Sequence, residues 1–474
     1  MSSLPSSFRD PSGFVFSHDG TVYRQINESF AAAFDQFVES GLYQALADKG
    51  YLVSHEDVTA SDVPRQPGCY KVIEPQQLPY ISYPYEWSFS QLKDAAMLTL
   101  RIQTVALKHG FVLKDASAYN IQFVGGKPVF IDTLSFEPYV DGTPWVAYRQ
   151  YCQHFLAPLA LMSYVDVDLG KLLVTHIDGV PLALASKLLP TRTRLSYALQ
   201  AHIHVHAKLQ SDYADAAGDS GSNSAKTDSA TKANKAKLSA SGLQAIVESL
   251  ASIVRKLEWK PPATEWGDYY DHTNYSDDST SRKKELVAQL LSCIEQPLNV
   301  VHDLGANTGE YSRIAAEHAD LVVSQDIDPV AVERNYRQVK ASEPRNVLPL
   351  LQDLFSPSPA IGWANEERDS FRQRGRCDAL MALALVHHLA ISNNTPLDRI
   401  AELFAELADW LIIEFVPKTD SQVIRLLETR QDIFPHYTED GFEQAFGEYF
   451  EITQKKAVTG SERSLYLMQS RAQR

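Results

Sequence analysis

Short apolar runs alternate with amphipathic stretches through the C-terminal half of the chain. Consecutive apolar residues predict buried strands, whereas apolar residues spaced three and four apart predict helices. Strands are predicted at residues 298–303, 321–326, 347–353, 377–384 and 409–415, and helices at 310–319, 329–340 and near 396–408. Residues 450–458 and 464–469 predict an antiparallel hairpin across Thr459-Gly460. This order predicts an α/β fold, a Rossmann-like doubly wound sheet with a C-terminal antiparallel hairpin.

The N-terminal half has a different pattern, which is typical of an α+β domain. Residues 91–109 predict a helix, and Gly125-Gly126 predicts the turn of a hairpin between two strands, the second of which ends at Asp132. Residues 13–24 are a further hairpin candidate.

A segment of small and polar residues separates the halves. Residues 211–241 are mostly Ser, Ala, Asp, Lys and Gly, and they contain almost no large apolar side chains. Such a segment buries too little surface to offset the entropy lost on ordering, so a disordered linker or loop is predicted. At 474 residues the chain is too long for one ordinary core. We therefore predict domains at residues 1–210 and 265–474, with the linker at 211–241 and a bridging helix at 242–264.

Charge and composition narrow the range of partners. The formal net charge is −15, which disfavours broad nucleic-acid binding because phosphate backbones are repelled. The four cysteines never pair as C-x-x-C, which argues against a disulfide framework or a zinc ribbon. The N-terminus has no apolar leader segment, and no apolar run is long enough to span a membrane. We expect a cytoplasmic protein.

The stretch from Asp303 to Gly309 is the first candidate site. It follows a predicted strand, where ligands of doubly wound sheets bind, and Gly305 and Gly309 would let a ligand approach the backbone closely. Asp326 ends the next strand and is placed to accept both hydroxyls of a ribose. A dinucleotide is one candidate ligand, but its G-x-G-x-x-G fingerprint is absent because Asn307 occupies the middle position. An acid before the loop favours a cationic ligand such as S-adenosyl-L-methionine (SAM).

These motifs, with the acids that follow successive strands, resemble class I SAM-dependent methyltransferases over roughly residues 265–474. The resemblance implies that Asp303, Gly305 and Gly309 line the methionine part of SAM, that Asp326 holds its ribose, and that Asp353 and Leu354 meet its adenine. It assigns further residues to the same cofactor site: Ala306, Asn307 and Ile327. Residues 266–275 resemble the aromatic lid of many such enzymes, which makes Tyr275 a weaker candidate.

Three residues are candidates for catalysis at the substrate end of this site. His387 and His388 follow the fourth strand of the sheet, and a neutral imidazole there could take a proton from the acceptor. A histidine beside a sheet end can equally well only bond a backbone carbonyl. Glu414 ends the fifth strand and is either a substrate contact or a structural acid. Methyl transfer mainly requires that the acceptor be held in line with the methyl group.

A second motif lies in the N-terminal half. Asp115 and Asn120 have the D-x-x-x-x-N spacing of kinase catalytic loops, and Asp132 follows the next strand. This resembles protein-kinase-like and aminoglycoside-phosphotransferase-like domains, which implies that Asp115 orients an acceptor hydroxyl and that Asn120 and Asp132 hold magnesium on ATP. Arg24 and Lys71 are weak candidates for the ATP cation, and no Gly-rich phosphate loop is present. Alternatively, the three residues cap turns in a substrate-binding domain.

The order of both motifs resembles bacterial nodulation NoeA-like methyltransferases. The leading hypothesis is a SAM-dependent methyltransferase whose N-terminal domain recognises the acceptor, which could be a small molecule, a saccharide or a protein. A phosphotransferase that uses Asp115, Asn120 and Asp132 is the first alternative. A regulatory protein made of two degenerate enzyme domains is the second.

Overall fold

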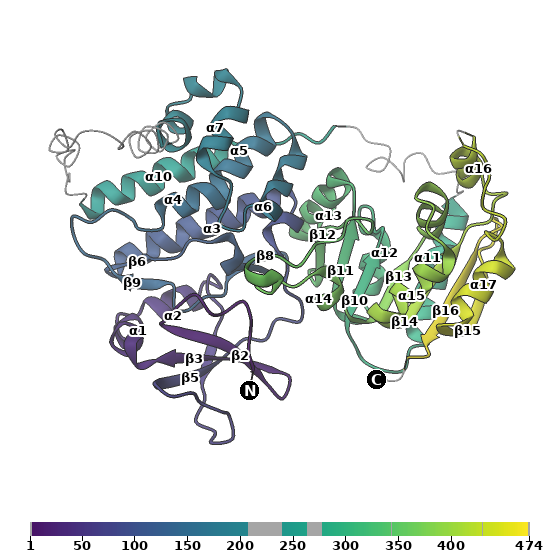
Figure 1. Ribbon diagram of the computed structural model, residues 1–474, viewed down its shortest axis with the longest axis horizontal. Coiled ribbons are helices and arrows are strands. Elements are labelled where there is room, and N and C mark those ends of the chain that lie inside the picture. The colour runs from purple at the N-terminus through teal and green to yellow at the C-terminus, as the bar shows by residue number, and fades with distance from the viewer. Residues whose placement is uncertain (1, 207–238, 263–276, 343, 429, 473–474) are drawn as a thin grey trace, which may run out of the picture.

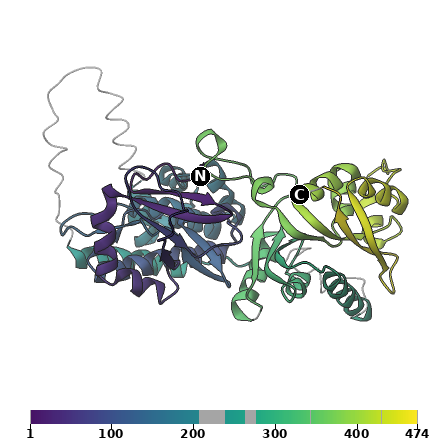
Figure 2. The ribbon, with the colours of Figure 1, turned by 90° about the horizontal axis from the view of Figure 1, so that it is seen from below.

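The computed structural model describes residues 2–206, 239–262, 277–342, 344–428 and 430–472. These residues form two regions that lie side by side (Figure 1), and the view from below agrees (Figure 2). The first region comprises residues up to 262, and the second comprises residues from 277 onward. Within the described residues, no helix has the length and apolar character needed to cross a bilayer.

The first region begins with a five-stranded antiparallel sheet. The predicted hairpin at residues 13–24 is confirmed, and it turns at Asp19 and Gly20, whose positive φ angles of 47° and 81° suit a tight reversal. The strands in spatial order are β1 Ser2–Ser3, β2 Gly13–His18, β3 Thr21–Asn27, β5 Cys69–Pro75 and β4 His55–Asp57. Two helices accompany this sheet, α1 Ala31–Glu39 and α2 Leu42–Ala47.

Helix α3, Phe89–Lys108, organises the rest of the first region and confirms the helix predicted at residues 91–109. It begins with a capping box, in which Ser88 and Gln91 satisfy each other's backbone N–H groups. Two short antiparallel pairs follow: β6 Phe111–Leu113 with β9 Phe136–Pro138, and the hairpin of β7 Ile121–Val124 with β8 Lys127–Phe130. The α-helices that follow are α4 Tyr148–Tyr151, α5 Ala157–Tyr164, α6 Leu172–Thr175, α7 Leu182–Leu188 and α8 Tyr197–Leu199.

Helix α10, Ala240–Lys256, packs against α3 and so completes the first region. Leu243, Val247 and Leu250 are buried at helical spacing along its inner face. Its Ser249 hydroxyl lies 3.0 Å from Nε2 of His202 in the π-helical segment Gln200–Val205. The helix predicted to bridge residues 242–264 therefore ends at Lys256 and packs within the first region. Most of the predicted linker at 211–241 lies outside the described residues.

The second region contains a seven-stranded sheet flanked by helices. Its strands in spatial order are β12 Val347–Leu351, β11 Ala319–Asp326, β10 Leu298–Leu304, β13 Cys377–Ala382, β14 Ala408–Phe415, β16 Ser464–Ser470 and β15 Phe450–Ala457. The first five are parallel, and the last two form the antiparallel hairpin. The predicted doubly wound sheet is therefore confirmed, and the predicted strands differ from these mainly at their ends. The order reverses beside β10, which places a ligand crevice at its carboxyl end.

The helices of the second region follow the predicted alternation with the strands. They are α11 Asp277–Ser292, α12 Glu310–Ala315, α13 Pro329–Ala341, α14 Phe371–Arg374, α15 Leu397–Leu407, α16 Ser421–Leu427 and α17 Glu439–Gly447. Helix α15 presents Ile400, Phe404 and Leu407 to the core, as the apolar spacing of residues 396–408 predicts.

A buried polar interface joins the two regions. Arg374 of α14 forms an ion pair with Glu86, which follows Tyr85 in the short helix before α3, and both side chains are almost wholly buried. At a second contact, the Ser90 backbone N–H donates to the Glu333 carboxylate of α13 at 2.9 Å. Because charges buried across an interface must stay paired, these contacts fix the second region against α3.

Candidate functional site

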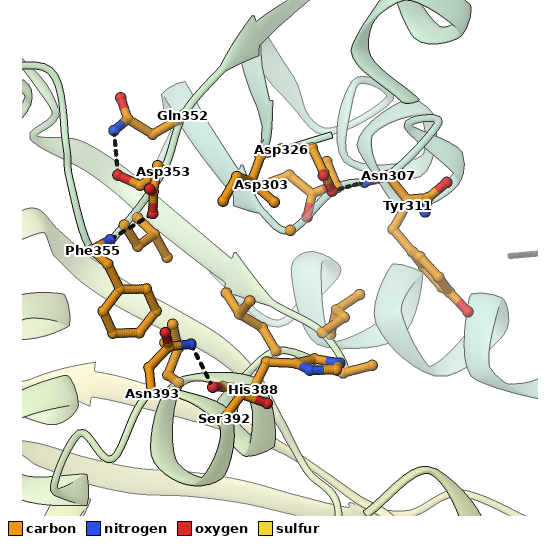
Figure 3. A pocket seen from close by; sticks show the side chains of 18 of the residues that line it. Asp303, Asn307, Tyr311, Asp326, Gln352, Asp353, Phe355, His388, Ser392 and Asn393 are labelled. Carbon is orange, nitrogen blue, oxygen red and sulfur yellow. Dashed lines mark hydrogen bonds between the residues drawn. The ribbon is translucent and has the colours of Figure 1, made fainter. Parts of the chain in front are cut away.

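A cavity of about 450 Å³ lies beyond the carboxyl ends of β10, β11, β12 and β13 (Figure 3). A volume of this size suits a small-molecule ligand. Its lining residues are Lys283, Asp303, Gly305, Ala306, Asn307, Tyr311, Asp326, Ile327, Gln352, Asp353, Leu354, Phe355, Leu383, Ala384, Leu385, His388, Leu389, Ser392, Asn393 and Leu426.

The loop after β10 forms the floor of this cavity. The backbone N–H groups of Gly305 and Ala306 both donate to the Gln325 carbonyl at 2.9 Å, which ties the loop to the adjacent strand. Gly305 has a φ of +72°, and a Cβ there would lie 3.1 Å from the Leu385 side chain. Glycine therefore keeps the backbone both relaxed and open to the cavity at this point.

Gly309 and a chain of polar side chains support the loop from below. Gly309 has a φ of +79°, and a Cβ would lie 2.5 Å from the Asn335 side chain. The Asn335 amide donates to the Ser324 hydroxyl at 2.8 Å, and Ser324 lies 2.7 Å from the Ser312 hydroxyl. Ser312 in turn donates to the Asp303 carboxylate at 2.6 Å. These bonds fix the orientation of Asp303 without any ligand.

Two buried carboxyl groups give the cavity its charge. Asp326 accepts hydrogen bonds from the backbone N–H groups of Asn307 at 2.7 Å and Asp328 at 2.9 Å. Burial raises its pKa to about 6 despite these bonds. Burial also raises the pKa of Asp303 to about 7, and the charge of Asp326 adds to this rise. A bound cation would favour ionisation of both groups, so the site is electrostatically suited to a positively charged ligand.

The opposite end of the cavity has a mixed polar and apolar wall. Asp353 accepts a hydrogen bond from the Phe355 backbone N–H at 2.8 Å, which turns the chain sharply after β12. The Phe355 ring stands at this end of the cavity and offers flat apolar surface, and the exposed Ile327 is another apolar lining residue. Figure 3 shows Phe355 and Asp353 on the far side of the cavity from Tyr311.

The two adjacent histidines occupy different environments. His388 lines the cavity, and burial together with Arg463 lowers its pKa to about 4. His387 is buried behind it, with the two ring centroids 4.1 Å apart, and burial lowers its pKa well below the ordinary value. Both rings are therefore neutral at physiological pH. Asn393 donates to the His388 carbonyl at 3.0 Å, which fixes the turn that presents His388 (Figure 3).

Glu414 is fully buried in an ion-pair network behind the cavity wall. Lys283 of α11 donates to it at 2.6 Å, and Arg463 lies 3.7 Å from its other oxygen. Arg463 also bonds the Asp420 carboxylate at 2.7 and 3.1 Å. Of the sequence alternatives for Glu414, this geometry favours the structural acid over a substrate contact.

A second cavity, of about 320 Å³, is lined by the five-stranded sheet, by the residues that flank the β7–β8 hairpin, and by residues 366–369 of the second region. Arg24 of β3 forms an ion pair with Asp132 there, and Asn120 lines the same cavity. Although burial opposes it, the charge of Arg24 and hydrogen bonds keep the pKa of Asp132 low. Asp115 lies behind this wall, where burial and then the Asp132 charge raise its pKa. The structure thus gathers the predicted kinase-type residues and pairs Arg24, rather than Lys71, with Asp132.

One relative matches nearly the whole chain. Over 467 residues the chain is 37% identical to nodulation protein NoeA of Rhizobium meliloti (strain 1021), and the match covers 98% of this chain and 95% of NoeA. The chain belongs to the NoeA family. The predicted resemblance to NoeA-like proteins is thereby confirmed, and no protein-family model matches the chain.

Solved methyltransferase structures match parts of this NoeA-family chain. The N-methyltransferase NodS of Bradyrhizobium japonicum WM9, in complex with S-adenosyl-L-homocysteine (SAH), is 12% identical with a TM-score of 0.30, covering 44% of this chain and 100% of NodS. Magnesium protoporphyrin IX methyltransferase ChlM of Synechocystis PCC 6803 is 18% identical with a TM-score of 0.31, covering 44% and 93%. The bifunctional kinase-methyltransferase WbdD is 16% identical with a TM-score of 0.28, covering 43% and 42%. At these scores the likenesses carry no conclusion about activity.

The structure of this NoeA-family chain brings most of the predicted cofactor residues to one cavity. The predicted residues that line it are Asp303, Gly305, Ala306, Asn307, Asp326, Ile327, Asp353, Leu354 and His388. Gly309 supports the loop from outside, and neither His387 nor Glu414 belongs to the lining. Tyr275 lies outside the described residues.

Lys283 is a lining residue that none of the sequence motifs indicates. It shares a helical stripe with the buried Val287 and Leu290, and the buried Ile294, just after the helix, continues the same spacing. A lysine in register with an apolar stripe faces the interior, and a buried lysine needs an anionic partner. The position of Lys283 in the apolar stripe could have indicated from sequence that it is buried. Its partner, Glu414, could not be predicted, because it is 131 positions away along the chain.

The raised pKa of Asp303 makes stability of the unliganded NoeA-family chain depend on pH. The unfolded carboxyl ionises near 3.8, whereas the folded carboxyl ionises only near 7, so the folded state loses stability as pH rises between these values. We expect Asp303→Asn to stabilise the protein at pH 8 by about 1 to 4 kcal/mol, with the gain shrinking toward pH 4. Urea unfolding of both proteins at pH 5, 6.5 and 8 measures this. A gain that is the same at all three pH values would contradict it.

Proposed function

We propose that this NoeA-family protein transfers the methyl group of SAM to an acceptor, with the second region as the catalytic unit. The observation that carries the proposal is the set of carboxyl groups, Asp303, Asp326 and Asp353, that converge on one cavity from three adjacent parallel strands. Their spacing along the sheet matches a ligand with a positively charged end and a ribose in the middle.

The residues of the cavity fit SAM part by part. Asp326 keeps its carboxylate at the edge of the loop, where it can accept hydrogen bonds from ribose hydroxyls. Phe355 offers flat apolar surface for an adenine near Asp353, and Ile327 adds an apolar side chain to the same cavity. The relaxed Gly305 backbone leaves room beside Asp303, whose charge complements an ammonium and a sulfonium.

When bound, SAM supplies a methyl group on a positively charged sulfur that is a good leaving group. The protein then needs to hold the acceptor nucleophile in line with that methyl group and to exclude water. His388, Ser392 and Asn393 form the part of the lining that can contact an acceptor. His388 is neutral at pH 7 because burial lowers its pKa to about 4. It can therefore accept a hydrogen bond from an acceptor O–H or N–H, but it is a weak base.

We assign acceptor recognition to the first region, with a small molecule, a saccharide or a protein as the acceptor class. Support comes from the cavity beside Asp132, which residues of both regions line, including Tyr119 and Arg368. Arg368 stands over the Tyr119 ring at 4.4 Å. A ligand in this cavity would therefore contact both regions at once.

A phosphotransferase activity of the first region is the second candidate function. The specific observation in its favour is the ion pair of Arg24 with Asp132 beside Asn120, in a cavity between sheet and hairpin. In such an enzyme Asp132 and Asn120 would hold magnesium and Arg24 would contact a phosphate.

Thermal unfolding with ligands distinguishes the two functions. We expect SAH at 100 times its Kd to stabilise the full-length protein by about 2.7 kcal/mol, a shift of a few degrees. ATP with Mg²⁺ alone should give no shift. Radiolabelled SAM incubated with bacterial extract and enzyme then identifies the acceptor class.

Two other results of the thermal unfolding experiment would contradict the proposed methyl transfer. A shift with ATP and Mg²⁺ that Asp132→Asn removes would favour the phosphotransferase. The absence of a shift with either ligand would contradict both enzymatic functions and favour a regulatory protein.

A further inference from the structure

Lys283 contributes a buried positive charge to the wall of the main cavity. Its side chain is only 5% exposed, yet it is a lining residue. Among the described lining residues it is the one lysine or arginine, and it faces a lining that includes Asp303, Asp326 and Asp353. A charge in this position is costly to bury, so its presence needs a structural or functional reason.

A layered network holds this ammonium in place. Glu414, which has no exposed surface, accepts from Lys283 at 2.6 Å, and Arg463 and Asp420 continue the alternation of charges behind it. This network offsets the cost of burying Lys283, but it does not explain why a charge faces the cavity. An apolar side chain could fill the same wall at lower cost.

The position of Lys283 along the cavity indicates which part of a ligand it would contact. Its Nζ lies 4.8 Å from the centre of the Tyr311 ring. Figure 3 places Tyr311 and Asp303 away from the end formed by Phe355 and Asp353. Lys283 therefore stands at the end where the proposed function puts the amino-acid part of SAM.

We propose that Lys283, positioned by Glu414, binds the carboxylate of the amino-acid part of SAM and SAH. An α-amino acid presents a positive and a negative group on one carbon, and Asp303 and Lys283 present the complementary pair of charges in the same wall. An ammonium preorganised by a buried carboxylate binds a carboxylate without further ordering. This inference rests on the proposed function, because it concerns the same ligand in the same cavity.

Calorimetric titration of the full-length protein with SAM and with decarboxylated SAM tests the proposal. The wild-type protein should bind decarboxylated SAM roughly tenfold or more weakly than SAM, since the second ligand lacks only the carboxylate. Lys283→Met should weaken SAM binding by a similar factor and leave the Kd of decarboxylated SAM unchanged or lower. Lys284→Met is the matched control, because the neighbouring Lys284 pairs with Glu310 and does not line the cavity. It should preserve both constants.

A second variant guards against loss of folding. If Lys283→Met unfolds the protein because Glu414 loses its nearest cation, Lys283→Met/Glu414→Gln removes both charges of this pair and should show the same ligand selectivity as expected for the single variant. Equal wild-type affinity for the two ligands would overturn the proposal, as would equal weakening of both ligands by the substitutions. The absence of any SAM binding by the wild-type protein would instead overturn the proposed function itself.

Discussion

The Asp326→Ala protein is expected to bind SAH at least roughly 100-fold more weakly than the wild-type protein, because two charge-assisted hydrogen bonds to the ribose would be lost. The substitution also removes the acceptor for the backbone N–H groups of Asn307 and Asp328, which hold the loop in shape. Isothermal titration calorimetry at pH 8 measures the effect with Asp326 ionised, since burial raises its pKa only to about 6.

Asp320→Ala is the matched control for this experiment. Asp320 lies near the start of the same strand, β11, and its side chain is exposed away from the cavity. We expect the Kd of the Asp320→Ala protein for SAH to equal that of the wild-type protein. Asp326→Asn removes the charge but keeps only one of the two acceptor oxygens that the Asn307 and Asp328 N–H groups use, so we expect SAH binding at least as weak as in Asp326→Ala. Unchanged SAH affinity in Asp326→Ala would remove the central support for a SAM site.

Arg374→Met should destabilise the protein by about 3 to 5 kcal/mol, because it leaves Glu86 as an uncompensated buried charge at the interface of the two regions. The same change removes hydrogen bonds from Arg374 to the Tyr80 hydroxyl at 2.7 Å and the Ile81 carbonyl at 2.9 Å. Denaturant unfolding followed by tryptophan fluorescence measures the loss. A protein of two regions can unfold in steps, so the first transition is the relevant one.

Two further variants show whether the effect comes from the buried charge. Arg372→Met removes an exposed cation two positions earlier, whose partner Glu406 is also exposed, and should change stability by less than about 1 kcal/mol. Arg374→Met/Glu86→Gln removes both buried charges and should recover part of the loss. Equal effects of the Arg372 and Arg374 substitutions would contradict a special role for the buried pair.

The sheet of the second region could be predicted from sequence because its strands are buried on both faces. Such strands appear as continuous apolar runs, and an acid or a glycine at the end of each run marks the sheet edge. The positions of Asp303, Asp326 and Asp353 in the sequence therefore predict a cavity at this edge of the sheet. The conformation of the loop after the first of these strands depends on residues close in sequence. Gly305 could therefore be assigned to the cavity together with Asp303.

The remaining parts depend on contacts between residues far apart in the sequence. The sequence shows Glu414 only as an acid at the end of a strand. Its buried partner, Lys283, lies on a helix that precedes the sheet. The amphipathic pattern of α10 predicts a helix but not the surface that it covers, so its packing on α3 could not be foreseen. Strand β5, Cys69–Pro75, mixes polar and apolar residues without strict alternation, and its pairing with β3 and β4 defines it.

The segment between β12 and β13 has one consequence for how the protein can be dissected. Its beginning, at Asp353, forms a wall of the proposed cofactor cavity, and its middle, at Arg368 and Asp369, forms a wall of the second cavity, which both regions line. Neither cavity is complete without this single stretch of chain, and its Arg374 is secured by the other region. A fragment that begins after residue 262 would keep every strand of the seven-stranded sheet. It would lose Glu86, which holds Arg374 and the segment that lines both cavities. Fragments are therefore poor substitutes for the intact polypeptide in ligand studies.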